Sequence, residues 1–168
     1  QPRSVSPIME IRDIAAEISS SGGNHQLEVL FLQEEKASFI IANAIDISIG
    51  SPVYHSRILH KDRDNPVLLT ERWVNPVVAP DYTQQDFTKE SPSAYLCRVA
   101  PVAESEFFIE AQMPSKENRR LLQLKDNEPC LLLSRTIISG SYIASLSWFT
   151  YPGLRYRLKG CFRPNKPG

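Results

Sequence analysis

The sequence lacks long apolar runs, and it lacks an excess of charge of either sign. No stretch approaches 18 consecutive apolar residues, so neither a transmembrane helix nor a membrane partner is expected. Lysine plus arginine and aspartate plus glutamate number 19 each, which gives a formal net charge of zero. Nucleic-acid-binding domains carry a basic excess on one surface, so the neutral balance argues against direct DNA binding by this chain. The single basic run, near the C-terminus, is interpreted as a solvated tail.

The chain is also poor in cysteine, and Cys97, Cys130 and Cys161 are widely spaced without a CxxC pair. This usage fits a reducing cytoplasm, where we expect the three thiols to be free and buried. The first residues contain neither an apolar signal core nor an initiator methionine. We therefore expect the chain to be a piece of a longer, cytoplasmic protein.

Sequence motifs of enzymes and metal sites are missing as well. The chain has no GxGxxG, GxxxxGKS/T, GxSxG or HExxH. His25, His55 and His60 have no metal-ligand spacing with cysteines or carboxylates. The sequence thus predicts no cofactor, no metal and no catalytic residue, although an acid–base pair of His55 and Glu71 stays conceivable.

The sequence does contain a repeat, because the predicted order strand, helix, strand, strand occurs twice. A strand at 27–32, a helix at 37–45 and strands at 53–60 and 67–75 are followed by a strand at 104–112, a helix at 115–124 and strands at 130–138 and 142–151. Residues 77–101 form an insertion between the halves. Because hairpins join antiparallel strands, the sequence predicts one α+β domain with about six antiparallel strands.

A further helix is expected at the N-terminal end of the chain. Ser6 has the character of an N-cap and Pro7 that of a first helical residue, and an apolar stripe then runs from Ile8 to Ile18. Gly22 and its neighbouring glycine would end this helix. Residues 1–5 are interpreted as the end of a linker.

Glu71 interrupts an otherwise apolar strand face. Strand alternation places it on one face with Val67, Leu69 and Trp73, and it places Arg57 and His55 on one face of the preceding strand. An unpaired buried charge costs several kcal/mol. Either an internal Arg57–Glu71 ion pair or a polar cavity that receives a ligand would reduce this cost. Arg72, on the opposite face, is expected to lie in solvent.

Two other segments could add polar groups to such a cavity. The strand at 142–151 carries Ser145 and Tyr151 on one face, between apolar neighbours. The segment SPSAY begins with a predicted N-cap and a proline, which is typical of a helix start. Backbone N–H groups there, with the Ser93 hydroxyl and next to Tyr95, could hold an anion. An ordinary capped helix explains the same pattern.

Four separated motifs carry a resemblance to a known family. The runs ERWVNPVVAPDYTQQDF, SAYLCR, EPCLLLSRT and YPGLRYRL resemble the UTRA effector-binding domain of HutC-type GntR regulators, over nearly the whole chain from about residue 8. The resemblance implies a chorismate lyase-like fold, a homodimer and a small-molecule effector site within residues 6–168. It also implies operator binding through an N-terminal winged helix-turn-helix, which this sequence does not contain.

The resemblance further implies a set of ligand-binding residues. Its motifs place them at Arg57, His55, Glu71, Ser93, Tyr95 and Tyr151, to which the strand face described above adds Ser145. Sugar-phosphate-responsive members have a glutamate near position 145, where this chain has serine, which argues against an amino-sugar phosphate. Members that control histidine utilization imply urocanate, an imidazole joined to an acrylate, as the effector.

The resulting hypothesis is an effector-binding and dimerisation domain of a repressor, in which urocanate relieves DNA binding. In this hypothesis Arg57 and the Ser93 helix start hold the ligand carboxylate, and Glu71 accepts from the imidazole. The alternatives are a lyase on the same fold, a sensor of another small acid or sugar phosphate, a dimerisation module without ligand, and a DNA-binding domain.

Overall fold

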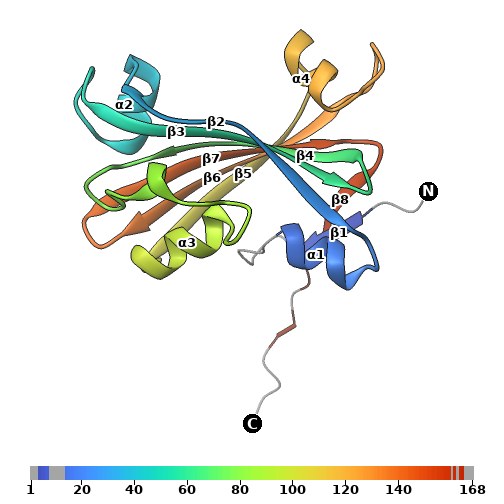
Figure 1. The fold of residues 1–168 in the computed structure, drawn as a ribbon, viewed down its shortest axis with the longest axis horizontal. Coiled ribbons are helices and arrows are strands. Elements are labelled where there is room, and N and C mark those ends of the chain that lie inside the picture. Colours follow the sequence, from blue (N-terminus) through green and yellow to red (C-terminus); the bar gives the residue numbers. More distant parts are fainter. Residues whose placement is uncertain (1–3, 8–13, 160, 162, 165–168) are drawn as a thin grey trace.

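A computed structural model describes residues 4–7, 14–159, 161, 163 and 164 of the chain (Figure 1). The elements, in chain order, are β1 (Ser4–Pro7), α1 (Ile14–Ser20), β2 (His25–Lys36), α2 (Phe39–Ile45), β3 (Pro52–Asp62), β4 (Asn65–Val74), the 3-10 helix η1 (Tyr82–Gln84), α3 (Pro92–Val99), β5 (Glu104–Gln112), α4 (Lys116–Leu121), β6 (Cys130–Ser139), β7 (Tyr142–Pro152) and β8 (Tyr156–Lys159). Among these residues, no helix is both long enough and apolar enough to cross a membrane.

Six strands form one antiparallel sheet in the order β2-β3-β4-β7-β6-β5. Each half of the chain supplies a strand, a helix and a hairpin, and the two halves meet at the β4–β7 pair in the centre of the sheet. The predicted repeat and the six antiparallel strands are therefore confirmed. The β3–β4 hairpin turns at Arg63 and Asp64, whose φ angles of 50° and 68° match the two positive angles that a tight hairpin of this hand requires.

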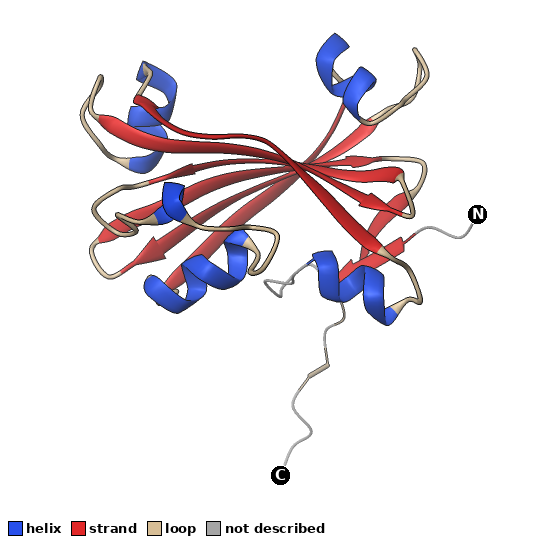
Figure 2. Ribbon diagram, in the orientation of Figure 1, coloured by secondary structure: helices blue, strands red, loops and turns tan. Residues whose placement is uncertain are grey.

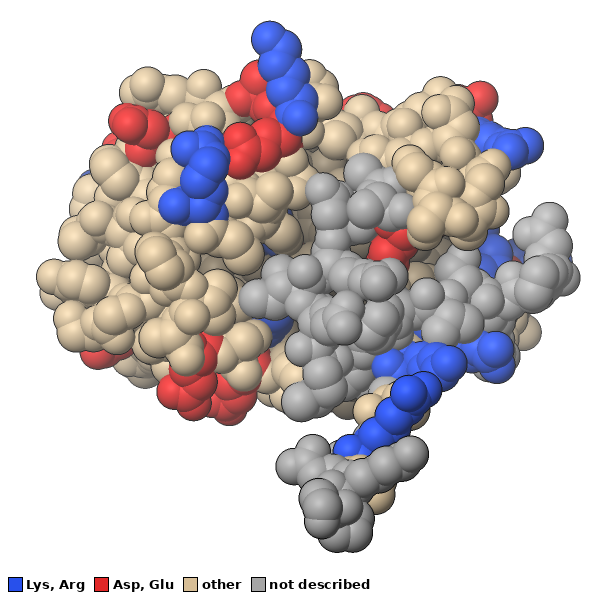
Figure 3. All heavy atoms as spheres, turned by 90° about the horizontal axis from the view of Figure 1, so that it is seen from below, with Lys and Arg blue, Asp and Glu red and all other residues tan. Residues whose placement is uncertain are grey.

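The two faces of the sheet are covered differently (Figures 1 and 2). One face, named here the α2/α4 face, carries α2 at one end and α4 at the other. The opposite face, named the α3 face, is covered by η1 and α3, with α1, β1 and β8 at the other end, and Figure 3 views the molecule from this side. Because α2 and α3 bury apolar residues against the strands of opposite faces, both faces contribute to the core.

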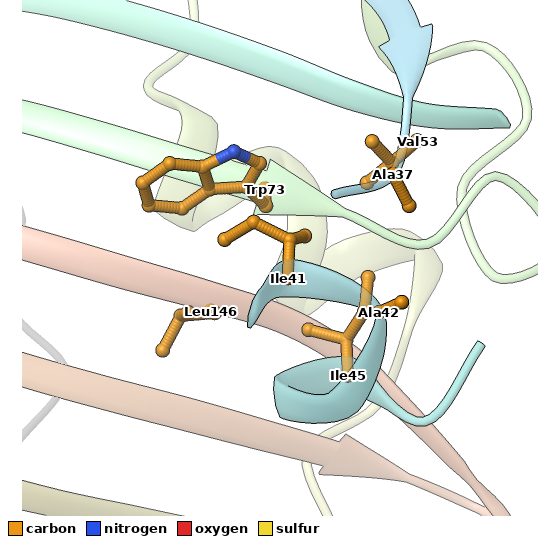
Figure 4. Packing of buried hydrophobic residues seen from close by; sticks show 7 residues of the cluster. All are labelled: Ala37, Ile41, Ala42, Ile45, Val53, Trp73 and Leu146. Atoms are coloured by element: carbon orange, nitrogen blue, oxygen red, sulfur yellow. The ribbon is translucent and has the colours of Figure 1, made fainter. Parts of the chain in front are cut away.

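Residues of α2 pack on the sheet through an apolar cluster (Figure 4). Ile41 and Ile45 lie against Trp73 of β4 and Leu146 of β7, and all four are buried. On the opposite face, Tyr82, Phe87, Tyr95 and Leu96 pack on Ile58 and Val74. Burying one such side chain contributes about 1.5–3 kcal/mol, so these clusters fix α2 and α3 on the sheet.

The N-terminal expectation was wrong in one respect. Ser6 and Pro7 do not start a helix, because they lie in β1, which pairs in parallel with β8 from the other end of the chain. Ile8 and Ile11 lie outside the described residues, and α1 ends before Gly22, as expected. The Ser91 cap of α3 is confirmed, since its hydroxyl accepts a hydrogen bond from the Ala94 N–H over 3.1 Å.

Candidate functional site

The sheet separates the seven predicted ligand-binding residues into two groups. His55, Arg57 and Glu71 lie on the α2/α4 face, whereas Ser93, Tyr95, Ser145 and Tyr151 lie on the α3 side. Successive strand residues point to opposite faces, so Glu71 turns towards Arg57 while Arg72 turns towards Ser93. The expectation that Arg57 and Ser93 hold the same carboxylate is therefore corrected.

On the α2/α4 face, Arg57 is surrounded by partners of its own chain. Its Nε lies 3.4 Å from Glu71 Oε2 and its Nη1 lies 2.9 Å from Glu117 Oε1. Its Nη2 donates a hydrogen bond to the Asn118 side chain in α4. The Arg57–Glu71 ion pair thus accounts for a carboxylate on an apolar strand face without a ligand.

His55 extends this network towards β2. Its Nδ1 lies 2.8 Å from Glu35 Oε1 and its Nε2 lies 3.8 Å from Glu71 Oε2, although the angles do not give well-formed hydrogen bonds. Its ring stacks on Trp73 with centroids 4.6 Å apart. Burial lowers the pKa of His55, but Glu71 and Glu35 outweigh it, so the pKa is raised above the ordinary value. A cavity of about 190 Å³ lies beside this network, next to Trp148 and Asn118.

The α3 face contains two buried arginines, Arg72 of β4 and Arg135 of β6. Their side chains are 3% and 9% exposed, so the expectation that Arg72 lies in solvent was wrong. Arg72 Nε donates to the Ser147 hydroxyl over 2.9 Å, and Arg72 Nη2 donates to the Ser93 hydroxyl over 3.0 Å. Both guanidinium groups lie over the Phe149 ring, at 5.5 and 4.7 Å from its centroid.

Neither arginine has a carboxylate partner among the described residues. Arg135 Nη2 has only a 3.5 Å contact with the Ser93 hydroxyl, and its Nε has no hydrogen-bond partner within that part of the chain. Burial, together with the positive charge of Arg72, lowers the pKa of Arg135 to about 10. Two buried like charges without a counterion are costly, and an anion placed between them would relieve that cost.

The space next to these arginines is named here the dibasic pocket. It is lined by Arg72, Ser93, Leu96, Cys97, Ala100, Val102, Arg135, Ile137, Ala144, Ser145 and Ser147. The space between its atoms totals about 340 Å³, which includes space open to solvent. The centre of a water-sized molecule can occupy only about 20 Å³ of it. That is room for about one water molecule, so a ligand of ten heavy atoms requires the pocket to widen.

Of the predicted residues, Ser93 and Ser145 line the dibasic pocket, and the two tyrosines do not. Tyr95 packs in the aromatic cluster with Tyr82 and Phe87. Tyr151 stacks on Tyr156 with centroids 3.8 Å apart, and burial raises the pKa of its hydroxyl. Both tyrosines therefore support the fold around the pocket.

The comparisons with known proteins agree with this architecture. A family model described as the UTRA domain matches residues 20–157. The chain belongs to the UTRA domain family. Its α+β, chorismate lyase-like fold is the fold of this family's effector domains, as the sequence resemblance implied. Within the described residues, no group of three or more histidine, cysteine or acidic side chains is placed to hold a metal ion.

Two relatives of this UTRA domain are close in sequence. The histidine utilization repressor of Pseudomonas aeruginosa is 41% identical over 162 residues, which are 96% of this chain and 65% of the repressor. The crystal structure of the C-terminal domain of histidine utilization repressor from Pseudomonas syringae pv. tomato has a TM-score of 0.81 at 42% identity, and the match covers 84% of this chain and 100% of that domain. The effector domain of PhnF from Mycobacterium smegmatis has a TM-score of 0.83 at 15% identity, over 95% and 99% of the two chains, which shows the common fold.

Proposed function

We propose that this UTRA domain is the effector-binding domain of a transcriptional repressor of histidine utilization. We propose further that it binds urocanate, or a similar small carboxylate, in the dibasic pocket. The observation that carries the proposal is the buried pair of Arg72 and Arg135, which has no carboxylate partner among the described residues. The relatives that match over nearly the whole chain are named as repressors, which favours a regulator over a lyase.

The ligand carboxylate would accept hydrogen bonds from both guanidinium groups. Arg135 Nε is free to donate, and Arg72 would exchange its neutral hydroxyl partner Ser93 for a charged one. The imidazole would lie against Leu96 and Ala144, with the Ser145 hydroxyl in reach of a ring nitrogen. Micromolar affinity requires about 8 kcal/mol. Two charged hydrogen bonds of about 1.5–3 kcal/mol each, with burial of the ring, would supply that.

Regulation would follow from the size of the pocket. Because the enclosed space holds about one water molecule, urocanate binding requires α3 to move away from the sheet. An effector shifts an equilibrium only as far as it prefers one arrangement over the other. In this proposal the widened arrangement is the one that releases operator DNA, which a winged helix-turn-helix outside these residues binds. The repressor would act as a homodimer in the cytoplasm, and light scattering of the purified chain tests the dimer.

Thermal unfolding with added ligands tests the proposal. At 100 times its dissociation constant, urocanate would stabilise the domain by about 2.7 kcal/mol, which raises the melting temperature by about 5–10 °C for a domain of this size. Histidine, imidazole, acrylate and an amino-sugar phosphate are the comparison ligands. A shift with the sugar phosphate alone would reassign the effector, and no shift with any acid would remove the proposal. The absorbance of urocanate should stay constant, because a lyase would change it.

A further inference from the structure

We propose that Cys97 is a covalent modification site of the dibasic pocket. A disulfide that carries a carboxylate would dock its charge on Arg72 and Arg135 and then react with the Cys97 thiol. This inference rests on the anion site of the proposed function, but not on the identity of the effector. Its consequence would be a second input to the domain, because a group attached to Cys97 occupies the space that the effector needs.

The placement of Cys97 on α3 carries the proposal. Cys97 and Ser93 are four residues apart in the helix, so they lie on the same helix face. The Ser93 hydroxyl contacts both arginines, and Cys97 lines the same pocket while its side chain is exposed. Cys97 therefore lies at the solvent side of a pocket that contains two buried positive charges.

A second observation, independent of the cysteine, points to an anionic reagent. Arg135 is more than nine-tenths buried, lines this pocket and has an Nε without a hydrogen-bond partner among the described residues. Cys97 and Arg135 line the same pocket. A carboxylate bound at Arg135 would therefore bring an attached disulfide next to the Cys97 sulfur.

The other two cysteines provide controls within the same chain. Cys130 is buried in an apolar cluster with Leu59 and Leu69, and burial raises the pKa of its thiol. Cys161 is exposed, as Cys97 is, but it lies in the C-terminal segment and does not line the dibasic pocket. Lys159 and Arg163 flank Cys161, so its reaction with an anionic reagent shows the effect of general charge attraction, whereas the reaction of Cys97 would add the effect of the pocket.

The reaction is an ordinary thiol–disulfide exchange. Cys97 gives its proton to solvent, and the resulting thiolate attacks one sulfur of the small disulfide. The bond between the two sulfurs of the reagent breaks as the bond to Cys97 forms. The products are a mixed disulfide on the protein and one equivalent of free thiolate. A thiol reductant reverses the exchange, so the modification is reversible.

Two disulfide probes of opposite character test the inference. The dianionic 5,5′-dithiobis(2-nitrobenzoate) and the neutral 4,4′-dithiodipyridine are each reacted with the chain, and modification at each cysteine is followed by peptide mass spectrometry. We expect folding to raise the ratio of the anionic-probe rate to the neutral-probe rate at Cys97 about tenfold over the ratio in the urea-unfolded chain, with the preference reduced by added salt. At Cys161, which Lys159 and Arg163 flank in either state, the ratio should change little on folding. The same ratio at Cys97 in the folded and the unfolded chain would overturn the proposal.

An arginine variant separates the pocket from the thiol. Arg135→Gln should slow the anionic probe at Cys97 about tenfold and leave the neutral probe unchanged. Arg120→Gln, an exposed change in α4 on the other face of the sheet, should alter neither rate at Cys97. An unchanged anionic rate in Arg135→Gln also refutes docking. If the Cys97 preference holds while urocanate produces no thermal shift, the modification site stands and the effector assignment fails. If urocanate stabilises the chain but Cys97 shows no preference, only the modification site fails.

Discussion

Arg72 and Arg135 meet at one hydroxyl, because the Ser93 side chain contacts Arg72 Nη2 at 3.0 Å and Arg135 Nη2 at 3.5 Å. A neutral hydroxyl satisfies hydrogen-bond geometry but cannot neutralise two positive charges. In a buried setting each charge keeps much of its desolvation cost. This part of the sheet is therefore held in an energetically unfavourable arrangement that a bound anion would improve.

The first prediction is that Arg135→Met separates stability from binding. Replacing a buried, incompletely paired charge by an apolar side chain of similar length is expected to raise the free energy of unfolding by about 1 kcal/mol at neutral pH. Chemical unfolding in urea measures this gain. The same variant should lose the urocanate-induced thermal shift. Arg98→Met is the matched control, because Arg98 is exposed and pairs with Glu90 at the surface, and it should keep both properties. An Arg135→Met chain that still responds to urocanate would contradict the assignment.

The second prediction concerns Glu71 on the other face of the sheet. Glu71→Gln removes one carboxylate from the Arg57 network and leaves Arg57 with the Asn118 side chain and with Glu117, which is largely exposed. We expect the free energy of unfolding to fall by about 1–2 kcal/mol, because a largely buried charge loses its inner partner. The urocanate-induced shift should remain as in the unchanged chain. Loss of urocanate binding by Glu71→Gln, measured by calorimetric titration, would instead place Glu71 in the effector site, as the family resemblance implied.

The third prediction is a pH dependence that arises at His55. Although burial opposes it, contact with Glu71 and Glu35 raises the pKa of His55 in the folded chain above its unfolded value. A raised folded pKa means that the stabilisation is fully present below the unfolded pKa, about 6.5, and is lost as pH rises through the higher folded pKa. Urea unfolding between pH 6 and pH 9 should show this decline, and His55→Gln should flatten it. The same decline in His55→Gln would assign the titration to another group.

Strand alternation and turn residues were sufficient to predict the repeat. The six strands, the position of α2 and the Ser91 cap all depend on local patterns that a single sequence contains. The pairing of β1 with β8 was missed, because it joins the two ends of the chain and has no local signal. The dibasic pocket was missed for a different reason, which lies in the register between strands.

Register decides which polar residues share a face. Alternation alone correctly grouped Glu71 with Trp73 on β4, and Ser145 with Tyr151 on β7. It does not say whether these two groups share one face of the sheet or lie on opposite faces. In the structure Arg72 pairs with Ser147 and Glu71 pairs with Trp148, so the serines belong with the arginine. The sequence did contain a signal for this pocket. Arg72 and Arg135 are each a charged residue on an apolar strand, and the face of the strand that each occupies points towards α3.

The fourth prediction is acid destabilisation that arises at His60. His60 is buried, its Nδ1 lies 2.9 Å from His25 Nε2, and burial with the positive charges of His25 and Arg72 lowers its pKa to about 3. A lowered folded pKa on a histidine means that the unfolded chain takes up the proton first, so stability falls as pH drops below about 6.5. Between pH 7 and pH 5 this one group should cost about 2 kcal/mol of unfolding free energy. Urea unfolding at the two pH values measures the difference, and His60→Gln should remove most of it. A His60→Gln chain that loses as much stability as the unchanged chain would show that another group controls the acid response.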